Sequence, residues 1–147
     1  MRLPELNVRV VADTNTVVSA FLWGGSPGAV FDAAREGRIA LFTSAALMVE
    51  LEDVLVREKF AERIARVGSS VPQILAGFRA LATIVRPALI EPTVRDPDDD
   101  HVLACALGAD AALIVTRDRD LLDLGSFRDI RILAARGALE FFTHQSR

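Results

Sequence analysis

Short apolar runs rich in β-branched residues alternate with helical patterns along the whole chain, and this alternation limits the fold more than any other feature. Strands that are apolar on both faces and alternate with helices are typical of a mostly parallel sheet covered on both sides. The expected strands are Val8–Ala12, Ile39–Phe42, Thr83–Arg86, Ala112–Thr116 and Ile130–Leu133. We therefore predict an α/β fold around a central, mostly parallel sheet of about five strands.

Signals for helix starts and stops fill the stretches between these strands. Ser44 and Asp96 are good N-cap residues, and Pro97 suits the first position of a helix. The glycine-rich segment 24–28 is expected as a loop that interrupts the first helical region. The pattern over 134–142 is ambiguous. The expected helices cover 16–23, 29–35, 45–56, 72–81 and 96–108, with a short helical turn over 120–124.

Length and composition restrict the class of protein. A chain of 147 residues suits a single domain over 1–147. Hydrophobic residues make up 51% of the chain, but no run approaches the roughly 18 residues of a membrane span. We expect the surplus to cover the buried sheet and an apolar interface with another chain. Cys105 is the only cysteine, which favours a buried thiol in a cytoplasmic protein.

Two acids follow predicted strands directly. Asp13 comes after the first strand, and Asp118 lies two residues beyond the fourth. In α/β sheets, ligands bind beyond the carboxyl ends of the strands, where the strand order reverses. Both carboxylates are therefore expected at the edge of the sheet where sites are built.

Two further acids lie on the apolar faces of predicted helices. Glu50 shares a face with Leu47 and Val54, and Asp99 shares one with Val102 and Leu103. Carboxylates that converge in one place repel one another, and burial adds a desolvation cost. A hard divalent cation with oxygen ligands, Mg²⁺ or Mn²⁺, resolves both problems. His101 and His144 are isolated and there is no cysteine pair, so zinc is not indicated.

Each acid also has a purely structural interpretation. Asp96, Asp98, Asp99 and Asp100 all lie at a helix start, where a negative charge stabilises the helix by about 0.3–1 kcal/mol. Asp13 is equally suited to cap the helix that follows it. The convergence of acids from four segments on one predicted edge nevertheless favours a metal site.

Four segments, in this order and spacing, resemble the motifs of the PIN-domain family: Val10–Asn15, Ser44–Leu55, Asp96–Ala106 and Ile114–Leu122. They are most like its bacterial and archaeal branch described as toxin components of toxin–antitoxin pairs. The resemblance implies a three-layer α/β/α fold. It also implies a metal-dependent ribonuclease acting on RNA with one or two Mg²⁺ or Mn²⁺ ions, often a homodimer and often silenced by a cognate antitoxin.

The resemblance also assigns residues. The acidic quartet of the family falls on Asp13, Glu50, Asp99 and Asp118, as metal ligands and catalytic residues. Asn15 and Thr116 match small polar positions beside the first and last acids, and Asp96 matches an additional acid. Asp99 is preferred to Asp100 as the third acid because of its helix face, with Asp100 as the second choice. The quartet would hold the ions for hydrolysis of a phosphodiester, and Glu50 would ligate a second ion or position the attacking water.

Basic and aromatic residues near these segments suggest contacts with substrate. Arg117 and Arg119 flank Asp118 and are candidates for phosphate contacts, although solvated arginines are equally expected there. Trp23 precedes the glycine-rich segment and suits stacking on a base, but packing at an interface is the favoured interpretation. The net charge of −3 argues against binding nucleic acid through bulk positive charge, so any contact must come from local patches or bound metal.

Two other functions remain open. The Asp13-Thr14-Asn15-Thr16 run is similar to the signature of haloacid-dehalogenase-like phosphatases, but Asn15 replaces the second acid. Such enzymes, and phosphotransfer receivers, also need a placed lysine, and Lys59 is the only one in the chain. The second alternative is a non-catalytic module of the same fold that binds RNA or protein.

Overall fold

The computed structural model describes residues 7–145, with the side chains of 144 and 145 outside the description. The predicted single domain of 1–147 therefore extends at both ends beyond the described residues. Within the described part, no helix combines the length and the apolar character that crossing a membrane would require.

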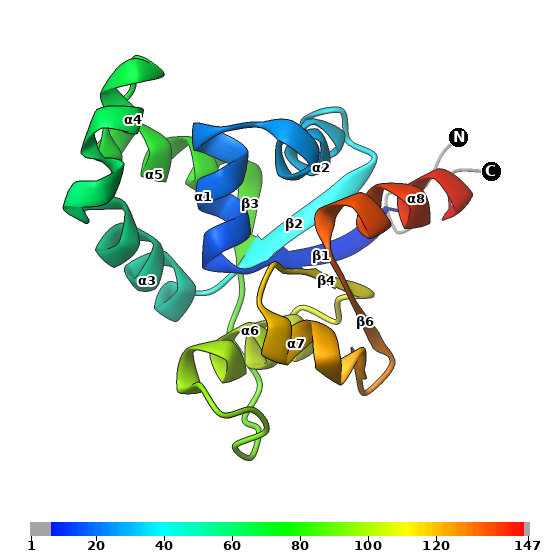
Figure 1. Cartoon of the computed structure of the whole chain (residues 1–147). Coiled ribbons are helices and arrows are strands. Elements are labelled where there is room, and N and C mark those ends of the chain that lie inside the picture. Colours follow the sequence, from blue (N-terminus) through cyan, green and yellow to red (C-terminus); the bar gives the residue numbers. More distant parts are fainter. Residues whose placement is uncertain (1–6, 146–147) are drawn as a thin grey trace.

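A six-stranded, mostly parallel sheet forms the centre of the molecule (Figure 1). Its order is β3-β2-β1-β4-β6-β5, and only β5 runs antiparallel to its neighbour β6. The strands are β1 (Val8–Ala12), β2 (Ile39–Thr43), β3 (Ala82–Ile84), β4 (Leu113–Val115), β5 (Ser126–Phe127) and β6 (Ile130–Leu133). The predicted α/β class is confirmed, and the additional strand is a two-residue edge strand too short to show any periodicity in the sequence.

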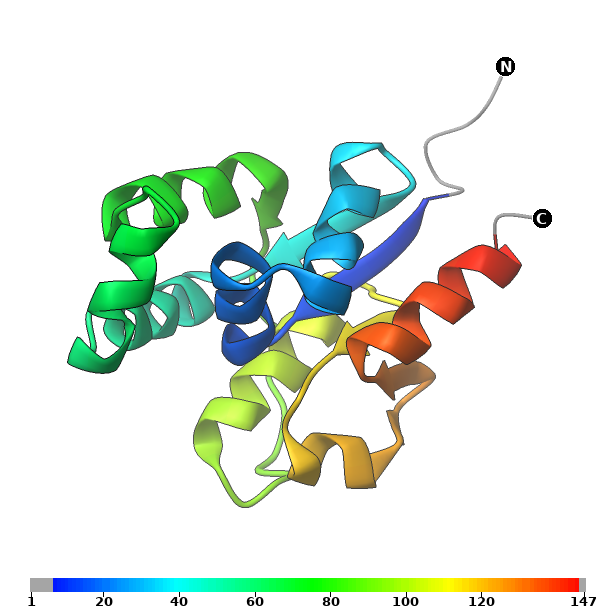
Figure 2. The same cartoon turned by 45° about the horizontal axis from the view of Figure 1, so that its top comes forward.

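Helices cover both faces of the sheet and give three layers. The α1–α5 segment and α8 lie over one face, and α6 and α7 over the other, as Figures 1 and 2 both show. The described helices are α1 (Thr14–Leu22), α2 (Gly25–Arg35), α3 (Ala45–Leu55), α4 (Ala61–Arg66), α5 (Val71–Leu81), α6 (Pro97–Gly108), α7 (Arg119–Leu124) and α8 (Ala135–Gln145), with a 3₁₀ turn η2 (Glu58–Phe60).

The central strand is buried on both sides, which is why its sequence shows no polar alternation. Val10 and Val11 are both 0% exposed, but they point into separate clusters on opposite faces. Val10 packs with Leu41 under the α1–α5 side, and Val11 packs with Ile114 under α6. Burying each such side chain contributes roughly 1.5–3 kcal/mol. The two cores hold the strand ends at a fixed position.

One predicted loop is wrong, one short helical segment was not predicted, and one ambiguity is resolved. Of the predicted loop 24–28 only Gly24 lies outside a helix, and Gly25–Gly28 form the first turn of α2. Pro27 is tolerated there because the first N–H groups of a helix have no partner within it. The η2–α4 segment was not predicted, since such short helices give little periodicity. The ambiguous tail folds as α8.

The order of strands places a switch point between β1 and β4. The chain builds β2 and β3 on one side of β1 and then returns to add β4 and β6 on the other. The crossovers therefore leave in opposite directions, and the carboxyl ends of β1 and β4 border an open edge. The Asp13 N–H donates to the Val115 carbonyl (3.1 Å), so the pairing of the two strands continues up to this edge.

A candidate metal centre of carboxylates

Asp13 is fixed at the end of β1 by two hydrogen bonds. It is 5% exposed and is the N-cap of α1, with Oδ1 accepting from the Thr16 N–H (2.9 Å). Its Oδ2 accepts from the buried Thr116 hydroxyl at the end of β4. The predicted capping role is therefore real, but each carboxylate oxygen has a second lone pair. Asp13 can cap α1 and still offer an oxygen to a cation.

Thr116 connects the first and last acids of the predicted quartet. Besides donating to Asp13, its Oγ1 accepts from the Asp118 N–H (2.9 Å). Asp118 then caps α7, with Oδ1 accepting from the Leu121 N–H (3.2 Å). Thr116 is 0% exposed, and its buried hydroxyl links Asp13 to Asp118.

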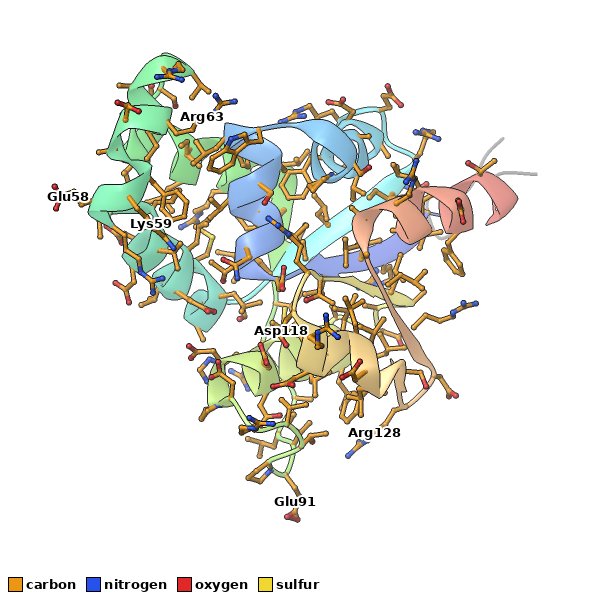
Figure 3. The ribbon with its side chains drawn as sticks, viewed as in Figure 1. Glu58, Lys59, Arg63, Glu91, Asp118 and Arg128 are labelled. Carbon is orange, nitrogen blue, oxygen red and sulfur yellow. The ribbon has the colours of Figure 1, made fainter. Side chains whose placement is uncertain are left out.

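Glu50 and Asp99 approach the same edge from opposite layers. In Figure 1 the first turns of α1 and α3 stand on one side of the edge, and α6 and α7 stand on the other. Ser44 caps α3 as predicted and Asp96 caps α6 as predicted. Glu50 is half-buried beside the buried Leu47 and Leu51 of α3. Figure 3 labels Asp118 in this region, where these helix ends meet.

One small cavity of about 80 Å³ brings the acids together. Six of its nine lining residues are acidic, which accounts for its polar character. The lining consists of Asp13, Thr14, Asn15, Glu50, Asp96, Asp98, Asp99, Val102 and Asp118. All four acids of the predicted quartet are present, together with the predicted Asn15 and Asp96.

Asp99 carries the clearest sign that an electropositive group belongs here. The residue is 8% exposed, and its buried Oδ2 has no hydrogen-bond partner among the described residues. Burial, followed by the nearby Asp118 and then by Asp96 and Asp13, raises the pKa of Asp99 to about 7. A buried carboxylate without a donor costs several kcal/mol unless a proton or a cation neutralises it.

Glu50 shows a milder form of the same effect. Burial raises its pKa, the neighbouring Thr14 hydroxyl lowers it, and the charges of Asp98 and Asp13 raise it again. Two acids from different layers of the fold thus resist ionisation in the absence of a cation. Such perturbed acids gathered in one cavity are typical of functional sites.

The donor set fits a hard divalent cation. One carboxylate oxygen from each of Asp99, Asp118 and Asp120 lies within 4.8 Å of the other two. Oxygen-only ligands of this kind suit Mg²⁺ or Mn²⁺. Cys105 is buried, and burial raises the pKa of its thiol to about 11, which confirms the predicted core thiol. His101 is exposed on α6 and lies outside the lining of the cavity.

Several candidate residues lie outside the cavity. The Asp100 carboxylate accepts from the Thr93 and Val94 N–H groups (3.1 and 3.0 Å), so it holds the loop before α6 instead. Thr116 is fully buried and is not among the residues that line the cavity. Arg117 donates to the Ser19 hydroxyl (2.7 Å) and lines a neighbouring pocket, and Arg119 is exposed at the start of α7.

Two acids near the site were missed as candidates. Asp98 lines the cavity, and Asp120 joins the group formed with Asp99 and Asp118. Both lie two residues after an N-cap aspartate, in the first turn of a helix. A capping aspartate and the residue two positions later lie near the same helix end, so this spacing was the available signal.

Fold and cavity together define an α/β protein with an oxygen-rich candidate metal centre at the switch point of its sheet. The model of one family, described as the PIN domain, matches residues 9–120. The chain therefore belongs to the PIN domain family, whose members are generally metal-dependent nucleases. Neither the curated proteins nor the solved structures gave a match.

Proposed function

We propose that this protein is a metal-dependent endoribonuclease that hydrolyses phosphodiester bonds of single-stranded RNA. The observation that carries the proposal is the buried Asp99 Oδ2, which has no partner among the described residues and lies in a cavity with five other acids. Such an arrangement is unfavourable for an apoprotein and is neutralised by a divalent cation. Membership of a nuclease family supports a catalytic role for that cation.

The acidic residues of the cavity would have different roles in this reaction. Asp13, Asp99 and Asp118 would hold Mg²⁺ or Mn²⁺, with Asp120 and Asp96 as neighbouring oxygens. The bound cation would acidify a water molecule and neutralise charge on the leaving oxygen.

Glu50 approaches from the opposite layer, and its raised pKa makes it a stronger base for the proton of the attacking water. The Thr116 hydroxyl holds Asp13 and Asp118 in a fixed position relative to each other through its two hydrogen bonds.

The proposed biological role is that of a toxin controlled by a cognate antitoxin, in a cytoplasmic homodimer. Support comes from the resemblance of the four motifs and from exposed apolar side chains on one helix. Val49 of α3 and Val56, the C-cap residue of this helix, are 61% and 62% exposed. Co-expression with the product of an adjacent small gene, followed by size-exclusion chromatography, tests both partners.

The phosphotransfer alternative is not favoured by the position of its required lysine. Lys59 lies in η2, and its Nζ is 5.1 Å from the centre of the Phe60 ring. Figure 3 shows Lys59 and Asp118 on separate parts of the molecule. The second alternative, a non-catalytic binding module, gives no reason for keeping an unpaired buried carboxylate at Asp99.

Cleavage of a labelled single-stranded RNA with Mg²⁺, with Mn²⁺ and with EDTA tests the proposal. The matched variants are Asp13→Asn, which keeps the N-cap, Asp99→Asn, and the control Asp123→Asn at an exposed position of α7. We expect metal-dependent cleavage in the parent and in the control, and none in the two site variants. Equal cleavage by the parent and Asp99→Asn, or none under any condition from folded protein, contradicts the proposal.

A further inference from the structure

A second hollow differs from the acidic cavity in charge. It has a volume of about 600 Å³ and is lined by residues of α1, the start of α2, the β4–α7 loop and the start of α8. Arg117, which directly precedes Asp118, reaches into this hollow rather than into the acidic cavity. Ser19 lies on the helix that Asp13 caps. We call this hollow the arginine pocket.

The charged residues that line the arginine pocket are both arginines, Arg117 and Arg136, and no acid lines it. Among the described residues, neither arginine forms an ion pair with a carboxylate. In a chain with a net charge of −3, two unpaired arginines in one hollow form a local basic patch of the kind that an acidic protein needs to bind a polyanion. The guanidinium group is well suited to phosphate because it presents several donors in a plane.

Trp23 supplies an aromatic surface to the same pocket. It is 55% exposed and lies at the end of α1. Arg63 fixes the indole in place, with its guanidinium carbon 5.2 Å from the ring centre and its Nε donating to the Leu22 carbonyl (2.7 Å). An exposed but positioned aromatic ring beside arginines is the usual means by which proteins hold an unstacked base and its phosphate.

Two helix starts strengthen the positive character of the pocket. Gly25 and Ser26 at the start of α2 and Ala135 at the start of α8 are all part of the lining. The N-cap of α2, Gly24, offers no side-chain hydrogen bond to this helix end. Helix starts carry partial positive charge and free N–H groups, which favours an anion.

From these features we propose that the arginine pocket binds a nucleotide of the single-stranded RNA next to the scissile phosphate. Arg117 and Arg136 contact its phosphate, and Trp23 stacks on its base. The inference rests on the proposed ribonuclease function and adds a direction to it. The strand runs from the acidic cavity along the β4–α7 loop toward the start of α2.

The composition of the chain offers a direct probe. Trp23 is the only tryptophan and there is no tyrosine, so the intrinsic emission reports on the pocket alone. Purified protein in EDTA, which prevents cleavage, is titrated with a short single-stranded RNA and the emission is corrected for absorbance. We expect saturable quenching that weakens as salt increases.

Variants separate the pocket from binding elsewhere. Arg136→Gln should weaken binding and reduce the salt dependence of log K by about 0.7, the value for one phosphate contact with a single strand. Trp23→Ala, followed by anisotropy of labelled RNA, should weaken binding about fivefold or more. Arg128→Gln is the matched control, because Arg128 is exposed beside Phe127 and lies far from Arg63 in Figure 3.

The outcomes distinguish this inference from the function on which it rests. Metal-dependent cleavage without any Trp23 response, or a response unchanged in Arg136→Gln, overturns the arginine pocket and leaves the ribonuclease. Quenching that Arg136→Gln weakens supports the pocket even where Mg²⁺ and Mn²⁺ give no cleavage, which counts against the ribonuclease alone. If the emission of Trp23 changes with the protein concentration and not with the RNA concentration, the pocket belongs to a protein interface and the inference is overturned.

Discussion

Single residues define the candidate metal centre, and Asp99 gives the strongest evidence for it. The helix-face pattern separated Asp99 from Asp100, because consecutive helical residues differ by about 100° in direction. The structure places Asp99 in the cavity and Asp100 on the backbone of the preceding loop. The spacing of Asp120 from the N-cap Asp118 indicated that both lie at one helix end, but the proximity of Asp120 to Asp99 depends on how α6 and α7 pack.

The raised pKa of Asp99 predicts a pH-dependent stability in the metal-free protein. An aspartate in an unfolded chain has a pKa of about 3.9, whereas that of Asp99 in the folded chain is about 7. Between these values the folded state keeps a proton that the unfolded state has lost. The contribution of this group to stability is therefore full below pH about 4 and is lost as the pH rises to about 7.

Asp99→Asn removes this dependence. Measured by urea unfolding in EDTA, the difference in unfolding free energy between variant and parent should rise with pH in favour of the variant, by at most about 1.4 kcal/mol per pH unit. Glu50 remains in both proteins, so its effect largely cancels. A difference in unfolding free energy that does not change with pH would show that burial and the neighbouring acids do not raise the pKa of Asp99.

Thr116 offers a test of how the acids are positioned. Thr116→Val keeps the shape of the side chain but removes the hydroxyl that joins Asp13 to the Asp118 N–H. We expect a loss of about 1–3 kcal/mol in stability and about 10–100-fold weaker binding of Mn²⁺, measured by urea unfolding and calorimetry. Thr116→Ser restores the hydroxyl and should restore most of the affinity. Equal affinities for the valine and serine variants would refute this positioning role.

Helices and strands were predictable where their end signals were strong. Ser44 and Asp96 cap α3 and α6 as their residue types indicated. The glycines of segment 25–28 misled the prediction, because glycine and proline indicate a loop unless tertiary packing holds them in a first helical turn. In this protein, the packing of α2 against α1 and α8 holds these residues in the helix.

Gly108, at the end of α6, is required by a close approach of the chain. A Cβ atom there would lie 2.2 Å from the Arg86 carbonyl oxygen, so the backbone of the β3–α6 loop would have to move. We expect Gly108→Ala to lower the unfolding free energy by about 1–3 kcal/mol in urea unfolding.

The matched control is Gly137→Ala in α8, where the nearest atoms are at an ordinary 3.7 Å. Alanine favours a helix over glycine by about 1 kcal/mol, so this variant should be neutral or more stable. If both alanine variants behave alike, the approach of the β3–α6 loop to α6 does not constrain position 108.

At the scale of the whole molecule, the topology brings distant acids to one place. The α/β class and the carboxyl-end rule together predicted the edge of the sheet at which the acidic cavity lies, because Asp13 and Asp118 follow β1 and β4. The separate arginine pocket was not predictable, since Arg117 and Arg136 are distant in sequence and meet only through the packing of α1, α2 and α8. The protein thus combines an acidic cavity with a local basic surface, which its net charge of −3 conceals.

Binding of Mn²⁺ measured by titration calorimetry tests the central claim most directly, which is that the acids at this edge form a metal centre. We predict saturable binding to the parent and to the control Asp123→Asn, and binding strongly weakened or lost in Asp99→Asn with its fold retained. Binding of the same affinity in Asp99→Asn, or no binding to the folded parent, would contradict a metal centre in this cavity.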